Sequence, residues 1–359
     1  MPKMLELKDE LFGCDVALED CIMKKGSLAT AGSKILENFV APFDATVVER
    51  LRDANIAIAC SRLQTSDFGV LVSRLPPEAR CPIPDAVHCC LCNDLFGQYR
   101  RQAAENGLCY IHPTYGTVSR YGLIPLASSM DQIGVLCKNM ADGFSLLAVI
   151  AGHDDKDGAM FPEKRYSYET TEKAVTLCVP SSILRRTDQC IQDGIRAFAE
   201  KFNVVDEPLD YFDVYSQVMT ILSCAEISNN INRYDGIKFG YRSPHAANLE
   251  SLYVKTRTEA FGLETKLAAI MGVWVLSHEQ YVPYYEKAMK IRRLIKQSLR
   301  FDKYDVIALP MALGAAVTAL PTLAGLPSIS FSWNGCGIQL VANVKNENAL
   351  FTAWEVSQR

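Results

Sequence analysis

The chain has 359 residues, of which 49% are hydrophobic, and a formal net charge of −4. This composition allows a large buried core, and the weakly acidic balance disfavours broad electrostatic binding to nucleic acid. No apolar run has the length of a membrane span, and the first residues lack the apolar stretch of a secretory signal. The 13 cysteines follow no disulfide framework, so we expect reduced thiols and a cytoplasmic protein.

The hydrophobic pattern alternates between strand and helix periods along the chain. An apolar run at 16–18 has the length of a strand, and 42–60 has the pattern of a helix followed by a buried strand. Further helices and buried strands are predicted over 140–154, 174–180, 186–203 and 304–310. This alternation predicts an α/β fold in which helices cover a mixed or parallel sheet. We expect a single domain.

The longest predicted helix begins near Pro283, because proline is tolerated in a first turn and disfavoured inside a helix. Its apolar stripe comprises Tyr284, Ala288, Ile291 and Ile295. The rest of the helix is crowded with basic residues, namely Lys287, Lys290, Arg292, Arg293 and Lys296. A solvated helix face explains them most simply, and a contact with RNA or an acidic partner is the alternative.

One cluster of thiols raises the question of a metal site: Cys81, His88, Cys89, Cys90 and Cys92. Thiolate and imidazole groups bind zinc, but adjacent cysteines cannot easily share one tetrahedral site, and no second pair lies at zinc-ribbon distance. Buried thiols are the favoured interpretation, so we predict no metal and no cofactor. A cysteine nucleophile would require a base, and neighbouring positions in sequence do not establish that geometry. No phosphate-binding glycine loop is present either.

Two longer stretches carry a resemblance, "HPTYGTVSRYGLIPLASSMDQIG" (112–134) and "NMADGFSLLAVIAGHDDKD" (139–157). They resemble the amidase signature family, and within it the A subunits of glutamyl-tRNA(Gln) amidotransferases. Further matches follow in the same order: "KILENFVAPFDATVVERL", "NRYDGIKFGYRS", "RTEAFGLETK", "YVPYYEKAMKIRRLIKQ", "KYDVIALP" and "TLAGLPSIS". The resemblance covers most of the chain and implies a mixed β-sheet sandwiched by helices. The N-terminal helical region of the family has no counterpart, so we expect a shortened fold.

The resemblance also implies a catalytic arrangement against which this chain can be compared. In the family, a lysine at the end of the first strand acts through a serine in a cis peptide to activate a second, nucleophilic serine. Backbone N–H groups of a glycine-rich loop hold the oxyanion. The lysine position is Glu19 here, and the serine loop has no match between Phe68 and Asp94. The nucleophile falls on Gln98 in "NDLFGQYRRQA", where Asp94, Gly97, Arg100 and Ala103 are kept and Phe96 replaces a glycine.

The substrate-binding positions implied by the family have changed as well. Leu267 and Ala268 stand where arginine grips the substrate carboxylate, and Ala315 stands near the position of an aspartate that grips the ammonium. The tyrosine of the "RYDG" stretch is kept as Tyr234. Two further polar residues, Ser129 and Asp131, are expected to border the old pocket. The retained motifs are explained more simply by the needs of sheet and turns than by ligand binding.

These comparisons predict a catalytically inactive member of the family, with a degenerate region over 13–107 and a retained core over 108–359. Its expected role is binding, scaffolding or regulation, with a homodimer or a protein partner of the kind found in amidotransferase assemblies. We expect the interface on residues 1–50 or 72–92 and no contact with membrane, while contact with tRNA is disfavoured but stays open. The first alternative is an enzyme with altered catalytic residues, using Glu19, Asp94 or a cysteine. The second is a decayed paralogue without a selected role.

Overall fold

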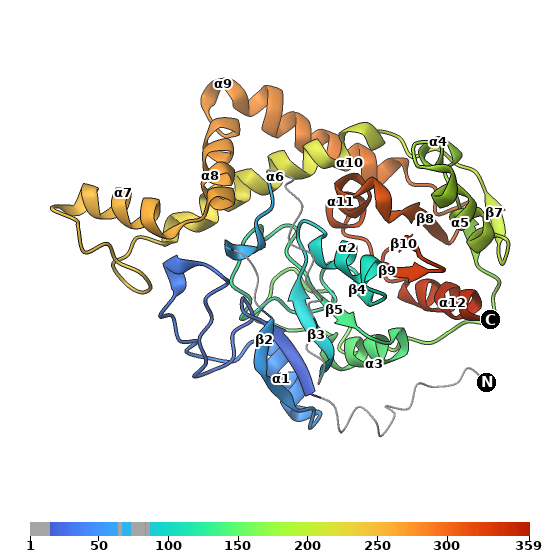
Figure 1. The fold of residues 1–359 in the computed structure, drawn as a ribbon, viewed down its shortest axis with the longest axis horizontal. Helices are drawn as coiled ribbons and strands as arrows, with labels where there is room; N and C mark the ends of the chain where they lie inside the picture. The colour runs from blue at the N-terminus through green and yellow to red at the C-terminus, as the bar shows by residue number, and fades with distance from the viewer. Residues whose placement is uncertain (1–14, 64–66, 73–82, 84–86) are drawn as a thin grey trace.

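The computed structural model describes residues 15–63, 67–72, 83 and 87–359. In this part of the chain, one mixed sheet of ten strands has the order β2-β1-β3-β5-β4-β9-β10-β8-β6-β7 (Figure 1). The strands are β1 Asp15–Glu19, β2 Ile58–Leu63, β3 Val87–Asn93, β4 Cys109–His112, β5 Ile133–Cys137, β6 Thr176–Cys178, β7 Asn203–Val205, β8 Val306–Pro310, β9 Ser328–Trp333 and β10 Cys336–Ala342. The α/β fold class predicted from the sequence is confirmed.

The two ends of the sheet are parallel and its centre is antiparallel. Strand β1 pairs in parallel with both β2 and β3, and β6 pairs in parallel with β7 and β8. Between them, β3, β5, β4, β9, β10 and β8 pair antiparallel. Parallel neighbours require crossover connections, which explains the helices between these strands. Because β1 and β3 are parallel, their carboxyl ends lie at the same end of the sheet. This places Glu19 beside Asn93.

Helices cover both faces of the sheet. The helices are α1 Thr46–Asp53, α2 Gln98–Glu105, α3 Met140–Ile150, α4 Ser181–Leu184, α5 Gln189–Ala199, α6 Tyr215–Asn230, α7 Leu249–Ala260, α8 Leu263–Val275, α9 His278–Gln280, α10 Lys287–Ser298, α11 Ala315–Ala324 and α12 Glu347–Gln358. Helix α2 packs on β4 and β9 on one face, while α3 and α12 pack together on the other. Short 3-10 turns lie at Lys34–Leu36, Asp67–Gly69, Phe212–Val214, Ile231–Arg233 and Met311–Leu313.

The alternation along β4 shows how the two faces are filled. Tyr110 packs with Tyr99 and Ala103 of α2, whereas Ile111 belongs to the larger core cluster on the α3 side. This is the period of two expected of a strand buried on both faces. None of the helices in the described residues is long and apolar enough to cross a membrane.

The helix predicted to begin at Pro283 starts earlier. Helix α9 leads into a π-helical turn, Tyr281–Glu286, which contains Pro283 and continues into α10. The prediction of Pro283 in a first turn is therefore wrong. A π turn has wider hydrogen-bond spacing and accommodates a residue without an N–H. Tyr284 is also not part of an inward stripe, since it is exposed and its ring lies 4.7 Å from the ring of Trp274.

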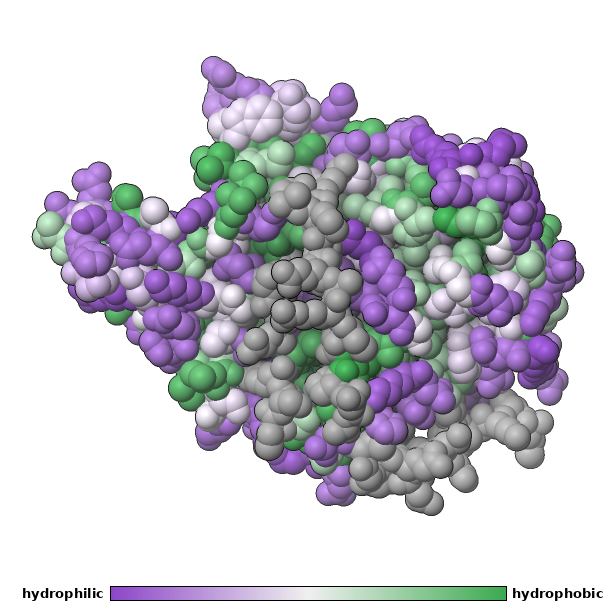
Figure 2. All heavy atoms as spheres, viewed as in Figure 1, coloured by the Kyte–Doolittle hydropathy of each residue, from purple (hydrophilic) through white to green (hydrophobic). Residues whose placement is uncertain are grey.

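Three helices extend from the rest of the molecule on the left and upper left of Figures 1 and 2. Helices α7, α8 and α9 project from the body that contains the sheet. Hydrophobic residues gather at the surface over α8 in this view, next to the hydrophilic tip at α9.

Candidate functional site

Glu19, the residue predicted at the position of the family lysine, ends β1 inside the protein. The residue is only 2% exposed, because β1 is flanked by β2 and β3. One carboxylate oxygen accepts hydrogen bonds from the backbone N–H of Asn93 at 2.6 Å and from the Cys21 thiol at 3.1 Å. The other oxygen accepts a hydrogen bond from the Tyr99 hydroxyl at 2.9 Å. The Tyr99 side chain therefore extends from α2 to Glu19 at the carboxyl end of β1.

Burial controls the protonation of this group of side chains. Desolvation raises the pKa of Glu19 to about 7, although the hydrogen bonds from Asn93, Cys21 and Tyr99 oppose the shift. Burial, followed by the nearby Glu19 charge, raises the pKa of Cys21 and Tyr99 well above their ordinary values. Near neutral pH the thiol and the phenol are therefore both hydrogen-bond donors, and Glu19 is close to half ionised.

Gln98 is the first residue of α2 and is half-buried. It follows Gly97, whose φ of +74° lies in the left-handed region that favours glycine. A Cβ added at Gly97 would fall well inside contact distance of the Thr318 side chain on α11. The close approach of α2 to α11 thus accounts for the retention of this glycine. Gln98 is the residue that the sequence predicts at the position of the family nucleophile.

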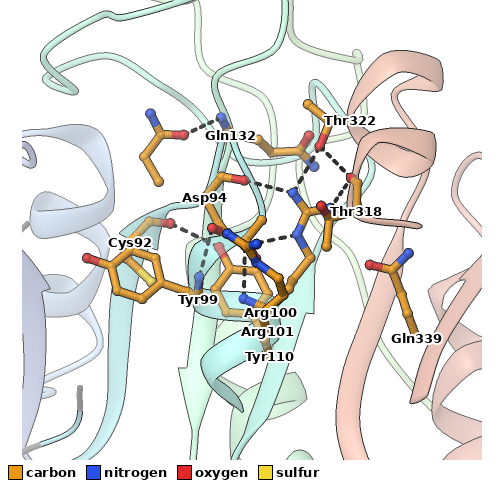
Figure 3. Close-up of polar contacts among 12 residues, drawn as sticks. Cys92, Asp94, Tyr99, Arg100, Arg101, Tyr110, Gln132, Thr318, Thr322 and Gln339 are labelled. Atoms are coloured by element: carbon orange, nitrogen blue, oxygen red, sulfur yellow. Dashed lines mark hydrogen bonds and ion pairs between the residues drawn. The ribbon is translucent and has the colours of Figure 1, made fainter. Parts of the chain in front are cut away.

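Asp94 and Arg100 form a buried ion pair that fixes the start of α2 (Figure 3). Both are fully enclosed, and Arg100 Nε donates to Asp94 Oδ2 at 2.9 Å. The same carboxylate accepts the backbone N–H groups of Tyr99 and Arg100 at 2.9 and 3.0 Å. The other guanidinium nitrogens donate to the Thr318 carbonyl, the Asp94 carbonyl and the Thr322 hydroxyl. This pair binds α2 to α11 and satisfies the first amides of the helix.

Asp131 organises the loop after β4. Its carboxylate accepts the backbone N–H groups of Leu126 and Ala127 at 2.8 and 2.9 Å, and the Asn93 side-chain amide at 3.0 Å. Burial raises the pKa of Asp131. The Asn93 side-chain oxygen also accepts the backbone N–H of Gln132 at 3.0 Å. One asparagine therefore connects the loop that contains Asp131 to Glu19.

Ser129 lies on the same loop and contacts two helices. Its backbone N–H and hydroxyl both donate to Glu226 of α6. Arg292 of α10 donates to the Ser129 hydroxyl and carbonyl at 3.0 and 3.1 Å and to the Leu323 carbonyl at 2.7 Å. Arg292 is thus a bridging residue between α10, this loop and α11. It does not belong to the solvated basic face predicted for that helix.

Tyr234 lies in an aromatic cluster. Its ring stacks on Phe68 with centroids 5.3 Å apart and meets the edge of Phe261 at 6.4 Å. Burial raises the pKa of Tyr234 to about 12. The tyrosine is therefore a packing residue with a protonated hydroxyl.

A cavity of about 360 Å³ lies between α6, the start of α11 and the loop before α2. Leu95 and Phe96 form one side, and Ala315 and Ala316 form another. Among the described residues, its lining includes Phe96 but none of Glu19, Gln98 and Tyr234. These three residues therefore do not meet in this cavity. Of the implied substrate clamps, Ala315 lines the cavity, Ala268 is buried and Leu267 is exposed on α8.

The cysteine cluster divides between the interior and the surface. Cys89, Cys90 and Cys92 of β3 are buried, and His88 of the same strand is exposed. Burial and the Glu19 charge raise the pKa of Cys92 well above its ordinary value. Within the described ranges, no group of three or more candidate ligands is arranged to hold a metal ion. Cys81 lies outside these ranges, as do the other residues of 73–82 and 84–86, where the sequence analysis found no match to the serine loop.

Sequence reasoning missed the residues that surround Glu19. Tyr99, Asn93 and Cys21 hold its carboxylate, and Thr318 faces Gly97. Tyr99 directly follows Gln98, so its place beside the altered nucleophile position was a signal available in the sequence. The role of Thr318 had no local signal, because α2 and α11 are more than 200 residues apart along the chain.

Comparison with known proteins now identifies the family. The Amidase family model matches residues 3–74 and 88–351. The A subunit of glutamyl-tRNA(Gln) amidotransferase from Lachnoclostridium phytofermentans is 34% identical over 91% of this chain and 76% of its own length. The protein of the same name from Listeria welshimeri is 35% identical over 95% and 82%.

Solved structures agree with this fold. A protein of a "vestigial protein complex" related to an s-triazine catabolic enzyme aligns with a TM-score of 0.78 at 17% identity, covering 96% of this chain and 83% of that one. The glutamyl-tRNA(Gln) amidotransferase protein of the same type from Thermotoga maritima aligns with a TM-score of 0.71 at 24% identity, covering 94% and 81%. The chain belongs to the amidase family, as a relative of the A subunits of glutamyl-tRNA(Gln) amidotransferases.

Proposed function

We propose that this amidase-family protein is a pseudoenzyme with a binding, scaffolding or regulatory role. The observation that carries the proposal is the state of Glu19. A carboxylate replaces the base expected from the family, and it is enclosed by Tyr99, Asn93 and Cys21. A general base must reach the proton that it removes, and an enclosed carboxylate that already accepts three hydrogen bonds does not.

Two further features support inactivity. Gln98, a carboxamide without nucleophilic character, occupies the position of the attacking serine. The family model leaves residues 75–87 unmatched, and this is the segment in which the serine loop of the family belongs.

The alternative of a rebuilt active site has less support. Asp94 is enclosed and paired with Arg100. The Cys21 and Cys92 thiols have pKa values raised by burial and by Glu19, so they lack the thiolate that a nucleophilic cysteine requires. Among the described cysteines, the exposed one is Cys190 on α5. Among the described residues, Asp94, Cys21 and Cys92 do not line the cavity beside Phe96, so they form no pair of base and nucleophile there.

We further propose that the chain acts as a single cytoplasmic amidase-like domain, with a degenerate region over 13–107. Its relatives are named as subunits of an amidotransferase. The partner we propose is accordingly a protein that resembles another component of such an assembly, or a second copy of this chain.

The binding role is tested by capture from the native cell followed by mass spectrometry. The bait is the full chain, and a variant with the buried pair broken, Arg100→Met, serves as the misfolding control. The role is supported by a specific partner that the wild-type bait captures in proportion to the amount of bait. A well-folded bait that captures nothing, and that sediments as a monomer at every concentration, favours a decayed paralogue.

A further inference from the structure

The outer face of α8 is apolar and lies in solvent. Its exposed residues are Leu263 (66%), Leu267 (38%), Ile270 (68%), Val273 (66%) and Trp274 (44%). The inner face, comprising Thr265, Ala268, Gly272 and Val275, is buried, and α8 packs on α6. The helix is therefore apolar on both sides. In a water-soluble protein such a helix is normally covered on both sides.

The exposed area is large for a free surface. These five residues together expose roughly 500 Å², which lies in the upper part of the range of about 300–600 Å² for the largest apolar patch on an ordinary monomer. Tyr284 of the π-helical turn extends the patch through its ring contact with Trp274. The extended patch supplies most of the roughly 800 Å² that each partner contributes to an interface of standard size.

The regions expected from the sequence to form an interface are less apolar in their described parts. Between residues 15 and 50, the exposed large hydrophobic residues are Leu28 and Val40. These two residues form an antiparallel β-bridge with each other. Among the described residues, the exposed apolar surface is therefore larger on α8 than on residues 15–50.

The spacing along α8 indicates what covers it. Leu263, Leu267, Ile270 and Trp274 follow one another at intervals of four, three and four residues, which is the spacing of a coiled-coil seam. This series is the same when it is read backwards. In an antiparallel pair of α8 helices related by a twofold axis, Leu263 faces the partner's Trp274 and Leu267 faces the partner's Ile270. Such self-complementarity is what a twofold interface requires.

The charges beside the seam permit the same pairing. Glu264 accepts the backbone N–H of Val72 at 2.6 Å within its own chain. Lys266, on the other edge, lies opposite the partner's Met271 in the antiparallel arrangement, so like charges do not face each other. The helix lies at the periphery of the molecule, where a second copy can approach (Figures 1 and 2).

We propose that the outer face of α8 is the contact of a homodimer, in which two copies of this helix pack antiparallel. This inference goes beyond the proposed pseudoenzyme role, because it does not depend on whether the site is active. It names the occupant of the patch as a second copy of the chain.

Sedimentation equilibrium of the full chain over a wide range of concentration tests the proposal. We expect a monomer–dimer equilibrium whose dissociation constant rises at least about tenfold in Ile270→Glu, with unchanged circular dichroism. Leu263→Arg should weaken the dimer in the same way, and it replaces the first variant should that one unfold. Val204→Glu, at an exposed valine on β7, is the matched control and should dimerise like the wild type.

Cross-linking tests the antiparallel arrangement. In a Leu267→Cys, Ile270→Cys double variant, the new thiols face each other across the axis and should form disulfide-linked dimers. In Leu263→Cys the two thiols lie about 16 Å apart at opposite ends of the seam and should not. A monomer at all concentrations, a dimer that persists in both charged variants, or efficient linkage through Leu263→Cys would overturn the proposal.

Discussion

Glu19 shows how one buried side chain couples stability to pH. Burial raises the pKa of Glu19 in the folded protein to about 7, whereas its ordinary value of 4.5 applies in the unfolded chain. Between these two pH values the carboxyl group is mostly ionised in the unfolded chain and mostly protonated in the folded protein. The folded state is therefore penalised progressively as pH rises through this window, by about 3 kcal/mol in full. Below the window the carboxyl group is neutral in both states, and the penalty is absent.

Replacing the carboxyl group by an amide should remove this pH dependence. The unfolding free energy of Glu19→Gln minus that of the wild type should increase by about 2–3 kcal/mol from pH 5 to pH 8. Urea unfolding at both pH values measures it. Glu163→Gln is the control, because a hydrogen bond from Lys345 lowers the pKa of exposed Glu163 and its loss gives no such gain. Parallel pH curves for Glu19→Gln and the wild type would contradict the burial of an ionisable Glu19.

Gly97 provides a second test at a single residue. Gly97→Ala places a methyl group in the left-handed region and against Thr318. It should cost about 1–3 kcal/mol more than Gly107→Ala, which is the cost of overpacking. Gly107 has a similar φ of +68° but no atom within 4 Å of an added Cβ. Its alanine variant should therefore report the backbone cost alone, about 1–2 kcal/mol. Equal losses of unfolding free energy in urea would show that the contact of α2 with α11 is not tight.

The flanking motifs of the family predict which residues stand at the catalytic positions, Glu19 and Gln98, but not what surrounds them, and this assignment stays a prediction. The hydrogen bond from Tyr99 to Glu19 joins residues 80 apart and has no signature in local periodicity. The expected place of Ser129 and Asp131 beside a pocket stays a prediction, and Asp131 lines a cavity of about 300 Å³. Their side chains also bind backbone N–H groups and Glu226, and these contacts had no signal in the sequence.

At the scale of elements, α2 is held to α11 by the pair of Asp94 and Arg100. The first turn of a helix leaves N–H groups without partners, and Asp94 satisfies two of them. Arg100 then neutralises this carboxylate and reaches the Thr318 carbonyl at 2.8 Å. The retained family residues here have a structural explanation that requires no substrate.

Breaking this pair should leave a buried charge without a partner. Arg100→Met should lower the unfolding free energy by about 3–5 kcal/mol. Adding Asp94→Asn should recover part of the loss, so that the double variant costs less than the sum of the single ones. Urea unfolding of the three variants measures the coupling. Arg101→Met, at the neighbouring half-buried arginine, is the control, and a loss in Arg100→Met no larger than in this control would be evidence against the ion pair.

The helices and strands were mostly predictable from local pattern. The strand predicted over 304–310 is β8, and the helix predicted over 186–203 is α5, with ends shortened by a few residues. Pro283 was misplaced because the π-helical turn that tolerates it has no simple sequence signature. The order of strands in the sheet was not predictable, since β9 pairs with β4 across more than 200 residues.

At the scale of the whole molecule, catalysis in this family depends on several parts acting together. In the proposed pseudoenzyme, the serine loop and both substrate clamps are absent as well as the base and the nucleophile. Glu19→Lys with Gln98→Ser restores only two of these parts and should therefore give no ammonia release above background. A lysine at this position would also be buried beside Cys21 and Tyr99. Circular dichroism checks that the double variant folds. Turnover well above background in this variant would mean that the missing loop is dispensable.

Ammonia release by the purified wild-type chain from glutamine, asparagine and simple aryl amides is the most direct test of the proposed pseudoenzyme. A glutamine-hydrolysing relative, measured together with its own partners, is the positive control. Because the proposal places Glu19 and Gln98 at the base and nucleophile positions, the expected result is no release above a blank without protein. Turnover that disappears in Glu19→Ala or Gln98→Ala would contradict this expectation and establish an active amidase with altered catalytic residues.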